Sequence, residues 1–166
     1  MSRILLLGPW QLRPVGQFSQ GQYPEEEEGW YEQVLPAHWQ EHPALANYAG
    51  RMVYRRRFHW PGVDGTETRV WLRCAGIFYW SSVYLNGHHL GDHEGYFNPQ
   101  EYEVTAHIRP GENCLLIEVF CPDEAQKRNK RMIAGVFSHW NVGDRQANPG
   151  GIWLPVEIDT TGPLKF

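Results

Sequence analysis

The sequence predicts an all-β fold, a β-sandwich of the jelly-roll type. The chain has 17 Gly and 12 Pro among 166 residues, and they recur at short intervals that divide it into short segments. From about residue 50 onward, apolar and polar side chains alternate with the period of two that half-buried strands show. Because many short antiparallel strands must stack as two sheets or close on themselves to share one core, a sandwich is expected.

The N-terminal part, residues 1–29, is expected to be an extension made of a strand and a loop. The region from Leu12 to Trp30 is rich in Gln, Gly and Glu, which predicts a long loop with the run Glu25–Glu28 as a solvated face. We expect residues 30–166 to form the sandwich, so that the whole chain is one domain of ordinary size.

Several segments show the alternation that predicts strands. They are, with the residues sharing one face, Arg69–Ala75 (Val70, Leu72, Cys74), Tyr79–Leu85 (Tyr79, Ser81, Val83, Leu85), Glu101–Ile108 (Tyr102, Val104, Ala106, Ile108), Cys114–Cys121 (Leu115, Ile117, Val119) and Gly151–Asp159 (Ile152, Leu154, Val156, Ile158). Four carboxylates alternate with such faces and are expected to point into solvent, namely Glu101, Glu103, Glu118 and Glu157.

The dipeptide Asn86-Gly87 predicts a tight β-hairpin. Asn and Gly readily adopt the positive φ angles of a type I′ turn, so two antiparallel strands should flank it. The turn is followed by a polar cluster that could suggest a metal site, formed by His88, His89, Asp92, His93 and Glu94. The cluster has neither an HExxH pattern nor a closed four-ligand spacing. We interpret it as surface polarity of the turn and expect no metal.

Two segments lie outside the alternation. Asp123–Lys130 is charged and predicts one helical turn or a loop. Phe137–Gly150 has no periodicity, and a long aperiodic loop in a compact sandwich is more often functional than a linker.

The composition excludes several classes of protein. Apolar residues make up 42% and charged residues 20%, which suits a folded core and argues against general disorder. The formal net charge of −4, with no basic tail, lacks the footprint of a nucleic-acid binder. The apolar stretch after Met1 is too short for a signal peptide, and no run approaches the ~18 residues of a membrane helix. The three cysteines cannot all pair, so a reducing, cytoplasmic location is expected.

Several motifs occur in a fixed order from about Trp30 to Ile158. They are Val34-Leu35-Pro36-Ala37-His38-Trp39, Asn47-Tyr48-Ala49-Gly50 followed by Val53-Tyr54-Arg55-Arg56-Arg57-Phe58, Leu72–Ile77, Val83–Tyr96, Gly111-Glu112-Asn113 and Gly150-Gly151-Ile152-Trp153-Leu154-Pro155-Val156. Together they resemble the N-terminal sugar-binding domain of family 2 glycoside hydrolases, which include β-galactosidases, β-glucuronidases and β-mannosidases. The resemblance implies a jelly roll like that of galactose-binding domains, in agreement with the alternation. One departure is Leu154, where the family usually carries Arg.

The resemblance also implies that this chain alone is not a catalyst. Retaining glycosidases use two carboxyl groups about 5 Å apart. In this family both come from a (β/α)-barrel domain that follows later in the chain. Nothing in this sequence could encode such a barrel, which needs roughly 200 residues or more. The Asn-Glu dipeptide of the family's acid/base residue is also missing. We therefore expect no catalytic residue and no cofactor.

The candidate sugar contacts match loops that, in some family members, reach the rim of the active site. These residues are Asn47, Trp140, Asp144, Arg145 and Asn148. Planar amides, carboxylates and guanidinium groups match pairs of sugar hydroxyls, and aromatic rings stack on C–H faces. Asn and Asp residues also cap turns, and a Trp also packs against a sandwich or a neighbouring domain, so both interpretations stay open.

The leading hypothesis is a non-catalytic sugar-binding and structural domain of a family 2 enzyme similar to a β-galactosidase or β-glucuronidase. Its partners would be carbohydrate and the Ig-like and barrel domains of that parent, which hydrolyses β-glycosidic bonds. One alternative is an autonomous carbohydrate-binding module, which requires exposed, coplanar aromatic rings, with Trp140, Trp153 and Tyr96 as candidates. The other is a structural or protein-interaction domain with a large apolar patch at a sheet edge, through which it could form homo-oligomers.

Overall fold

Strands dominate the computed structural model of the chain, which describes residues 3–17, 28–63, 68–121 and 150–162. The strands are β1 (Arg3–Leu5), β2 (Gly8–Val15), β3 (Tyr31–Leu35), β4 (Gly50–Trp60), β5 (Arg69–Cys74), β6 (Ile77–Phe78), β7 (Trp80–Leu85), β8 (His88–Glu94), β9 (Gln100–Glu103), β10 (Gly111–Cys121), β11 (Gly151–Ile152) and β12 (Val156–Thr161). Two 3-10 helical turns, η1 (Trp39–Glu41) and η2 (Pro43–Leu45), lie between β3 and β4. The predicted all-β class is confirmed.

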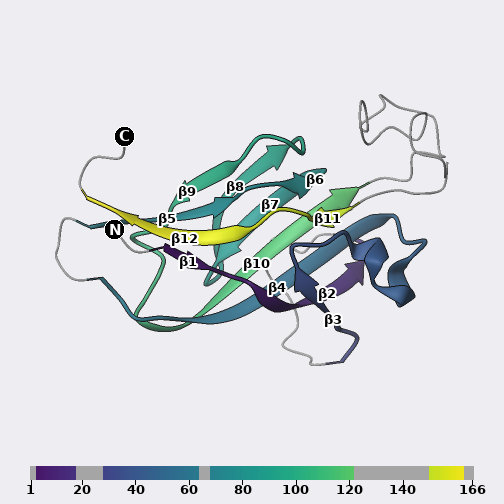
Figure 1. Ribbon diagram of the computed structural model, residues 1–166, viewed down its shortest axis with the longest axis horizontal. Helices are drawn as coiled ribbons and strands as arrows, with labels where there is room; N and C mark the ends of the chain where they lie inside the picture. Colours follow the sequence, from purple (N-terminus) through teal and green to yellow (C-terminus); the bar gives the residue numbers. More distant parts are fainter. Residues whose placement is uncertain (1–2, 18–27, 64–67, 122–149, 163–166) are drawn as a thin grey trace.

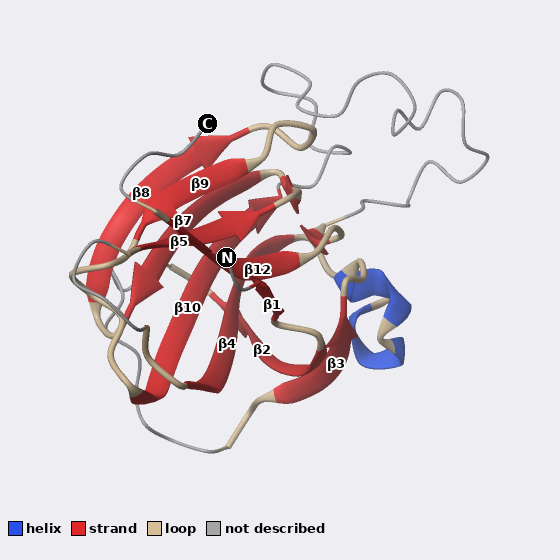
Figure 2. Cartoon of the chain, turned by 60° about the vertical axis from the view of Figure 1, so that its left-hand side comes forward, coloured by secondary structure: helices blue, strands red, loops and turns tan. Residues whose placement is uncertain are grey.

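The described strands pair antiparallel into two main sheets (Figure 1). One has the order β1-β12-β5-β9, the other the order β3-β2-β4-β10-β7-β8, and β6 pairs separately with β11. The sheets curve around a shared interior, with η1 and η2 beside β3 (Figure 2). In the described part of the chain, no helix is long and apolar enough to cross a membrane.

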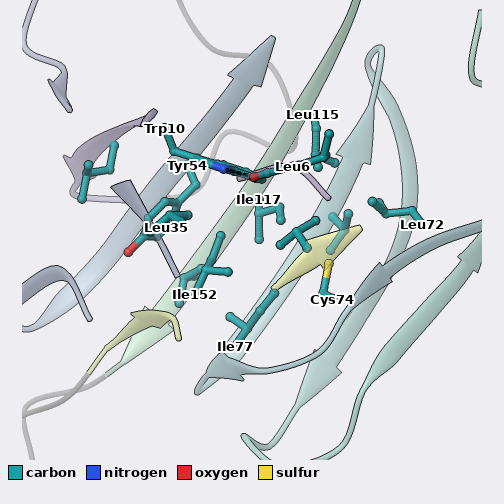
Figure 3. Packing of buried hydrophobic residues seen from close by; sticks show 14 of the residues in the cluster. Leu6, Trp10, Leu35, Tyr54, Leu72, Cys74, Ile77, Leu115, Ile117 and Ile152 are labelled. Atoms are coloured by element: carbon teal, nitrogen blue, oxygen red, sulfur yellow. Dashed lines mark hydrogen bonds between the residues drawn. The ribbon is translucent and has the colours of Figure 1, made fainter. Parts of the chain in front are cut away.

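A single large cluster of buried apolar side chains joins the two sheets (Figure 3). Tyr54 and Ile117 enter it from the six-stranded sheet, and Leu72 and Cys74 enter it from the four-stranded sheet. Burial raises the pKa of the Cys74 thiol to about 12, so this cysteine stays protonated and packs as a small apolar side chain. The shared core makes the fold a β-sandwich.

The predicted loop from Leu12 onward is wrong at its beginning, because Leu12–Val15 belong to β2. Strand β2 lies between β3 and β4, and Leu12 is fully buried opposite Tyr54. Trp10 is also buried, and its Nε1 donates to the Leu6 carbonyl over 2.9 Å. Burial of alternate apolar residues thus overrides the polar composition of this region.

The predicted hairpin at Asn86-Gly87 is confirmed between β7 and β8. The φ angles are +50° at Asn86 and +84° at Gly87, as a type I′ turn requires. The Asn86 side chain also ties the turn to neighbouring backbone. Its Nδ2 donates to the His107 carbonyl over 2.8 Å, and its Oδ1 accepts from the Cys114 amide over 2.9 Å. The turn is therefore a junction between β8 and β10 as well as a hairpin.

The strand predicted over Glu101–Ile108 ends earlier, because β9 stops at Glu103. The Val104 carbonyl accepts the amides of His107 at 2.8 Å and Ile108 at 2.9 Å, which closes a turn. Thr105 Oγ1 accepts the Val70 amide over 2.9 Å. The side chain of Thr105 thus satisfies a backbone donor of β5 at this edge.

The prediction that Glu118 and Glu157 face solvent is wrong, since they are only 1% and 4% exposed. Glu157 Oε2 accepts from Arg3 Nε over 2.8 Å, and Glu157 Oε1 lies 3.5 Å from Arg73 Nη1. Glu118 lies in β10 next to Val53 of β4, whose side chain belongs to a second buried cluster. The outer faces of both sheets are therefore partly packed, which alternation alone does not reveal.

Candidate functional site

The candidate site lies at the end of the sandwich where β11 follows Gly150. Of the predicted sugar contacts, Asn47 is described, and it lies exposed in the turn between η2 and β4. The other predicted contacts, Trp140, Asp144, Arg145 and Asn148, lie outside the described residues. In sequence, Asn148 precedes Gly150 by two positions. The described part of the site is thus the Asn47 turn together with the backbone at Gly150.

The segment leading to Asn47 is shaped by two short helical turns. Glu41 Oε1 accepts the His38 amide over 2.9 Å at the start of η1. Pro43 at the first position of η2 suits a helix start, because its fixed φ is already helical. Trp39 and Leu45 are buried and hold the segment to the core. These contacts leave Asn47 on an exposed turn of defined position.

The helical turns bind directly to Gly150. The Trp39 amide donates to the Gly150 carbonyl over 2.9 Å, and the Gly150 amide donates to Gln40 Oε1 over 3.1 Å. A Cβ on Gly150 would lie 2.5 Å from Trp39 Cε2 and closer still to Cζ2 and Cη2. Both backbone groups of Gly150 are thus satisfied by η1, and the indole ring leaves no room for a side chain there.

The same two side chains reach the Asn47 turn through Tyr48. Trp39 Nε1 donates to the Tyr48 carbonyl over 2.9 Å, and Gln40 Nε2 donates to the same oxygen over 3.3 Å. The rings of Trp39 and Tyr48 also meet edge to face, with centroids 5.6 Å apart. Trp39 and Gln40 therefore connect two segments that lie about one hundred residues apart in sequence, and sequence reasoning missed this connection.

An aromatic ridge continues the site along the same end of the sandwich. His38 stacks on Trp153 with centroids 6.3 Å apart, and Phe97 meets Trp153 edge-on at 5.9 Å. Tyr96 contacts Phe97 at 4.5 Å, with the ring planes 56° apart. Phe97 is 55% exposed, whereas Tyr96 and Trp153 are half-buried. The coplanar arrangement expected for Tyr96 and Trp153 is wrong, because both rings pack at angles around Phe97.

The titratable groups beside this ridge are held neutral at physiological pH. Burial lowers the pKa of His38, and this effect is partly offset by the charge of Glu41 and the Gly150 carbonyl. Burial, followed by the hydrogen bond to Glu94, raises the pKa of Tyr79 to about 12. The Tyr79 hydroxyl donates to Glu94 Oε1 over 2.9 Å. Neutral donors and acceptors of this kind suit the binding of sugar hydroxyls.

A second polar cluster on the outer face of β7 and β8 resembles a catalytic triad only by residue type. His89 Nε2 lies 3.1 Å from Ser82 Oγ and 3.0 Å from Asp92 Oδ1. Because one nitrogen makes both contacts, this histidine cannot pass a proton from serine on one side while aspartate holds the other nitrogen. Burial alone would raise the pKa of Asp92, but the hydrogen bonds of Ser82 and His89 lower it.

The residues after the Asn86 turn do not converge on one point. His88 stacks on His107 with centroids 4.5 Å apart, and His89 lies against Tyr84 with centroids 5.0 Å apart. Across the part of the chain that the structure describes, no group of three or more His, Cys, Asp or Glu side chains could hold a metal ion.

The comparison with known families decides which family this architecture belongs to. The family described as "Glycosyl hydrolase 2 galactose-binding domain-like" matches residues 38–159, which span η1, the Asn47 turn and most of β12. The chain belongs to this family. The resemblance inferred from the motifs is therefore confirmed.

Individual relatives agree with this assignment. The chain is 32% identical over 117 residues to an exo-β-D-glucosaminidase of Arthroderma benhamiae, covering 69% of this chain and 12% of that protein. It is 27% identical over 118 residues to a β-glucuronidase of Formosa agariphila, covering 70% and 11%. The solved β-glucuronidase of Bifidobacterium dentium, in complex with coumarin-3-O-glucuronide, superimposes with a TM-score of 0.72 at 26% identity, covering 98% and 30%.

This family domain therefore occurs within much longer glycosidases. The chain spans only about a tenth of the length of these curated relatives, at 11–12%. A β-glucuronidase of an uncultured Clostridium shares the fold with a TM-score of 0.73, and the chain covers 29% of it.

Proposed function

We propose that this chain is the non-catalytic, sugar-contacting sandwich of a larger glycosidase that cleaves β-glycosidic bonds, with a β-glucuronidase or β-galactosidase as the parent. The observation that carries the proposal is the joining of the Asn47 turn to Gly150 by Trp39 and Gln40. This arrangement brings the amide of Asn47 to the sandwich end where the segment containing Asp144 and Asn148 leads into Gly150. Two loops at one end can contact one sugar together.

The role of the sandwich is to support the domain that carries the reacting carboxylates and to supply one wall of its sugar pocket. The names of the relatives favour glucuronides, galactosides and glucosaminides as substrate classes. The neutral groups around His38 and Tyr79 fit binding rather than proton transfer.

The test uses the full-length gene product and the 166-residue chain in parallel. Hydrolysis of p-nitrophenyl β-D-glucuronide, β-D-galactoside and β-D-glucosaminide is measured for both. We expect activity only in the full-length protein, and an Asn47→Ala variant with a raised KM and a nearly unchanged kcat. Turnover by the 166-residue chain alone would contradict the non-catalytic role, and an unchanged KM in Asn47→Ala would contradict the sugar contact.

An autonomous carbohydrate-binding module is a second candidate, favoured by the exposure of Phe97. A single exposed ring can stack on a sugar face, so this function requires the isolated chain to bind an oligosaccharide and Phe97→Ala to abolish that binding. Calorimetry that detects no binding of glucuronate, galactose or chitobiose at millimolar concentration would exclude it.

A protein-interaction role has weaker support. Leu5 and Val34 are exposed apolar residues on β1 and β3, which are edge strands of the two sheets. The oligomeric state of the isolated chain, measured by light scattering, tests whether they drive self-association.

A further inference from the structure

The Gln40 side chain joins the two segments of the proposed sugar site with both ends of its amide. Its Oε1 accepts the Gly150 amide over 3.1 Å, and its Nε2 donates to the Tyr48 carbonyl over 3.3 Å. A side-chain amide can accept at the oxygen and donate at the nitrogen, and here each atom is used in that sense. Gln40 is half-buried, so water competes little for these two contacts.

The two groups that Gln40 joins belong to different parts of the chain. Tyr48 directly follows Asn47, whereas Gly150 lies 110 residues beyond Gln40. Trp39 makes a parallel pair of contacts, from its amide to the Gly150 carbonyl and from Nε1 to the Tyr48 carbonyl. Trp39 also fills the core, so its removal would disturb the fold itself. Gln40 is the member of the pair whose loss separates connection from packing.

We propose that Gln40 is a positioning residue that fixes the Asn47 turn relative to Gly150, and so holds two loops in register around one glycoside. The inference rests on the proposed function for its effect on sugar binding, but the connection itself is a property of the fold. Gln40 does not touch the substrate. It lowers KM because the two loops are already placed before the sugar binds.

The chemistry of the amide allows the two contacts to be broken separately. In Gln40→Glu a carboxylate still accepts the Gly150 amide but cannot donate to the Tyr48 carbonyl. In Gln40→Met both contacts are lost while the length of the side chain is kept. The matched control is Gln11→Met, because Gln11 Oε1 accepts from Arg55 Nε over 2.8 Å in the six-stranded sheet, away from the site.

The experiment compares these variants in the full-length gene product by amide hydrogen exchange and by hydrolysis of p-nitrophenyl β-D-glucuronide and β-D-galactoside. We expect exchange at Gly150 to become roughly tenfold faster in Gln40→Met and to stay near wild type in Gln40→Glu. Exchange at Tyr48 should become faster in both. KM should rise about three- to tenfold in both Gln40 variants, with kcat changed less than about twofold, and neither value should move in Gln11→Met.

Exchange at Gly150 and Tyr48 that is equal in Gln40→Met and Gln11→Met would overturn the connection. A wild-type KM in Gln40→Glu, despite faster exchange at Tyr48, would overturn the positioning role. If the wild-type protein hydrolyses neither probe, the proposed function fails. The exchange rates at Gly150 and Tyr48 then still decide whether Gln40 joins the loops.

Discussion

Replacing Gly150 with alanine tests whether the Trp39 ring closes the site end of the sandwich. The added Cβ would lie 2.5 Å from Trp39 Cε2 and closer to two further ring atoms. Carbon atoms in favourable contact are about 3.5–4.0 Å apart, so either the ring or the backbone must move. The ring is fully buried, and its Nε1 donates to the Tyr48 carbonyl over 2.9 Å, so a shift of the ring also strains that hydrogen bond.

The cost follows from these two effects. Overpacking a core costs about 1–3 kcal/mol and a lost hydrogen bond about 1 kcal/mol, so Gly150→Ala should lower the free energy of unfolding by about 2–4 kcal/mol. Gly16→Ala is the control, because nothing lies within 4 Å of a Cβ there. Urea denaturation followed by tryptophan fluorescence measures both. A Gly150→Ala variant within about 0.5 kcal/mol of the control would refute the steric argument.

A double-mutant cycle assigns the clash to the ring. Phenylalanine lacks the Cζ2 and Cη2 atoms that an alanine at position 150 would meet, so Trp39→Phe opens space at that point. Trp39→Phe is destabilising by itself, because it leaves a cavity and removes the Nε1 donor. The cost of Gly150→Ala should nevertheless fall by roughly 1 kcal/mol or more in the Trp39→Phe background. Additive costs would show that Gly150 is constrained by something other than the indole.

Three further predictions concern the frame of the fold. Asn86→Gly keeps the positive φ but removes the side-chain hydrogen bonds, so unfolding in urea should show a loss of about 1–3 kcal/mol, and unchanged stability would contradict the junction. Glu157→Gln should lower stability by about 1–2 kcal/mol because the buried side chain loses its charge beside Arg3, while the half-exposed Glu101→Gln should change it by less than about 0.5 kcal/mol. Because burial lowers the pKa of His38, the unfolded chain takes up a proton at higher pH than the folded one, and stability should fall below about pH 6.5. His38→Phe should lose that part of the acid dependence in denaturation curves from pH 8 to pH 5, and equal slopes for both proteins would rule out His38 as its source.

Much of the fold could be predicted because its signals are local. The alternation in Arg69–Ala75 and the dipeptide at Asn86 each act within a few residues, and both gave the correct elements. The buried position of Glu118 could not be predicted in this way. Alternation assigns side chains to two faces, but whether the second face is also covered depends on residues from other strands, such as Val53 and Tyr84.

The candidate site was predictable only in part, for the same reason. Asn47 was found because it lies in a short motif, and the structure places it on an exposed turn. The roles of Trp39 and Gln40 depend on contacts with Gly150, about 110 residues away, which no local pattern reports. Trp39 was named only as part of a motif, and nothing in that motif distinguishes a core tryptophan from one that joins two loops.

The glycine pair at positions 150 and 151 determines which side chains are available for sugar contact. Gly150 is excluded from carrying a side chain by the Trp39 ring. Gly151 has a φ of +125°, and a Cβ there would lie 2.7 Å from the Tyr54 hydroxyl. Neither position can therefore contribute a functional group. The groups nearest to the pair must come from farther along the chain at Trp153 or from across the joint at Asn47, and the second of these depends on the hydrogen bonds of Gln40.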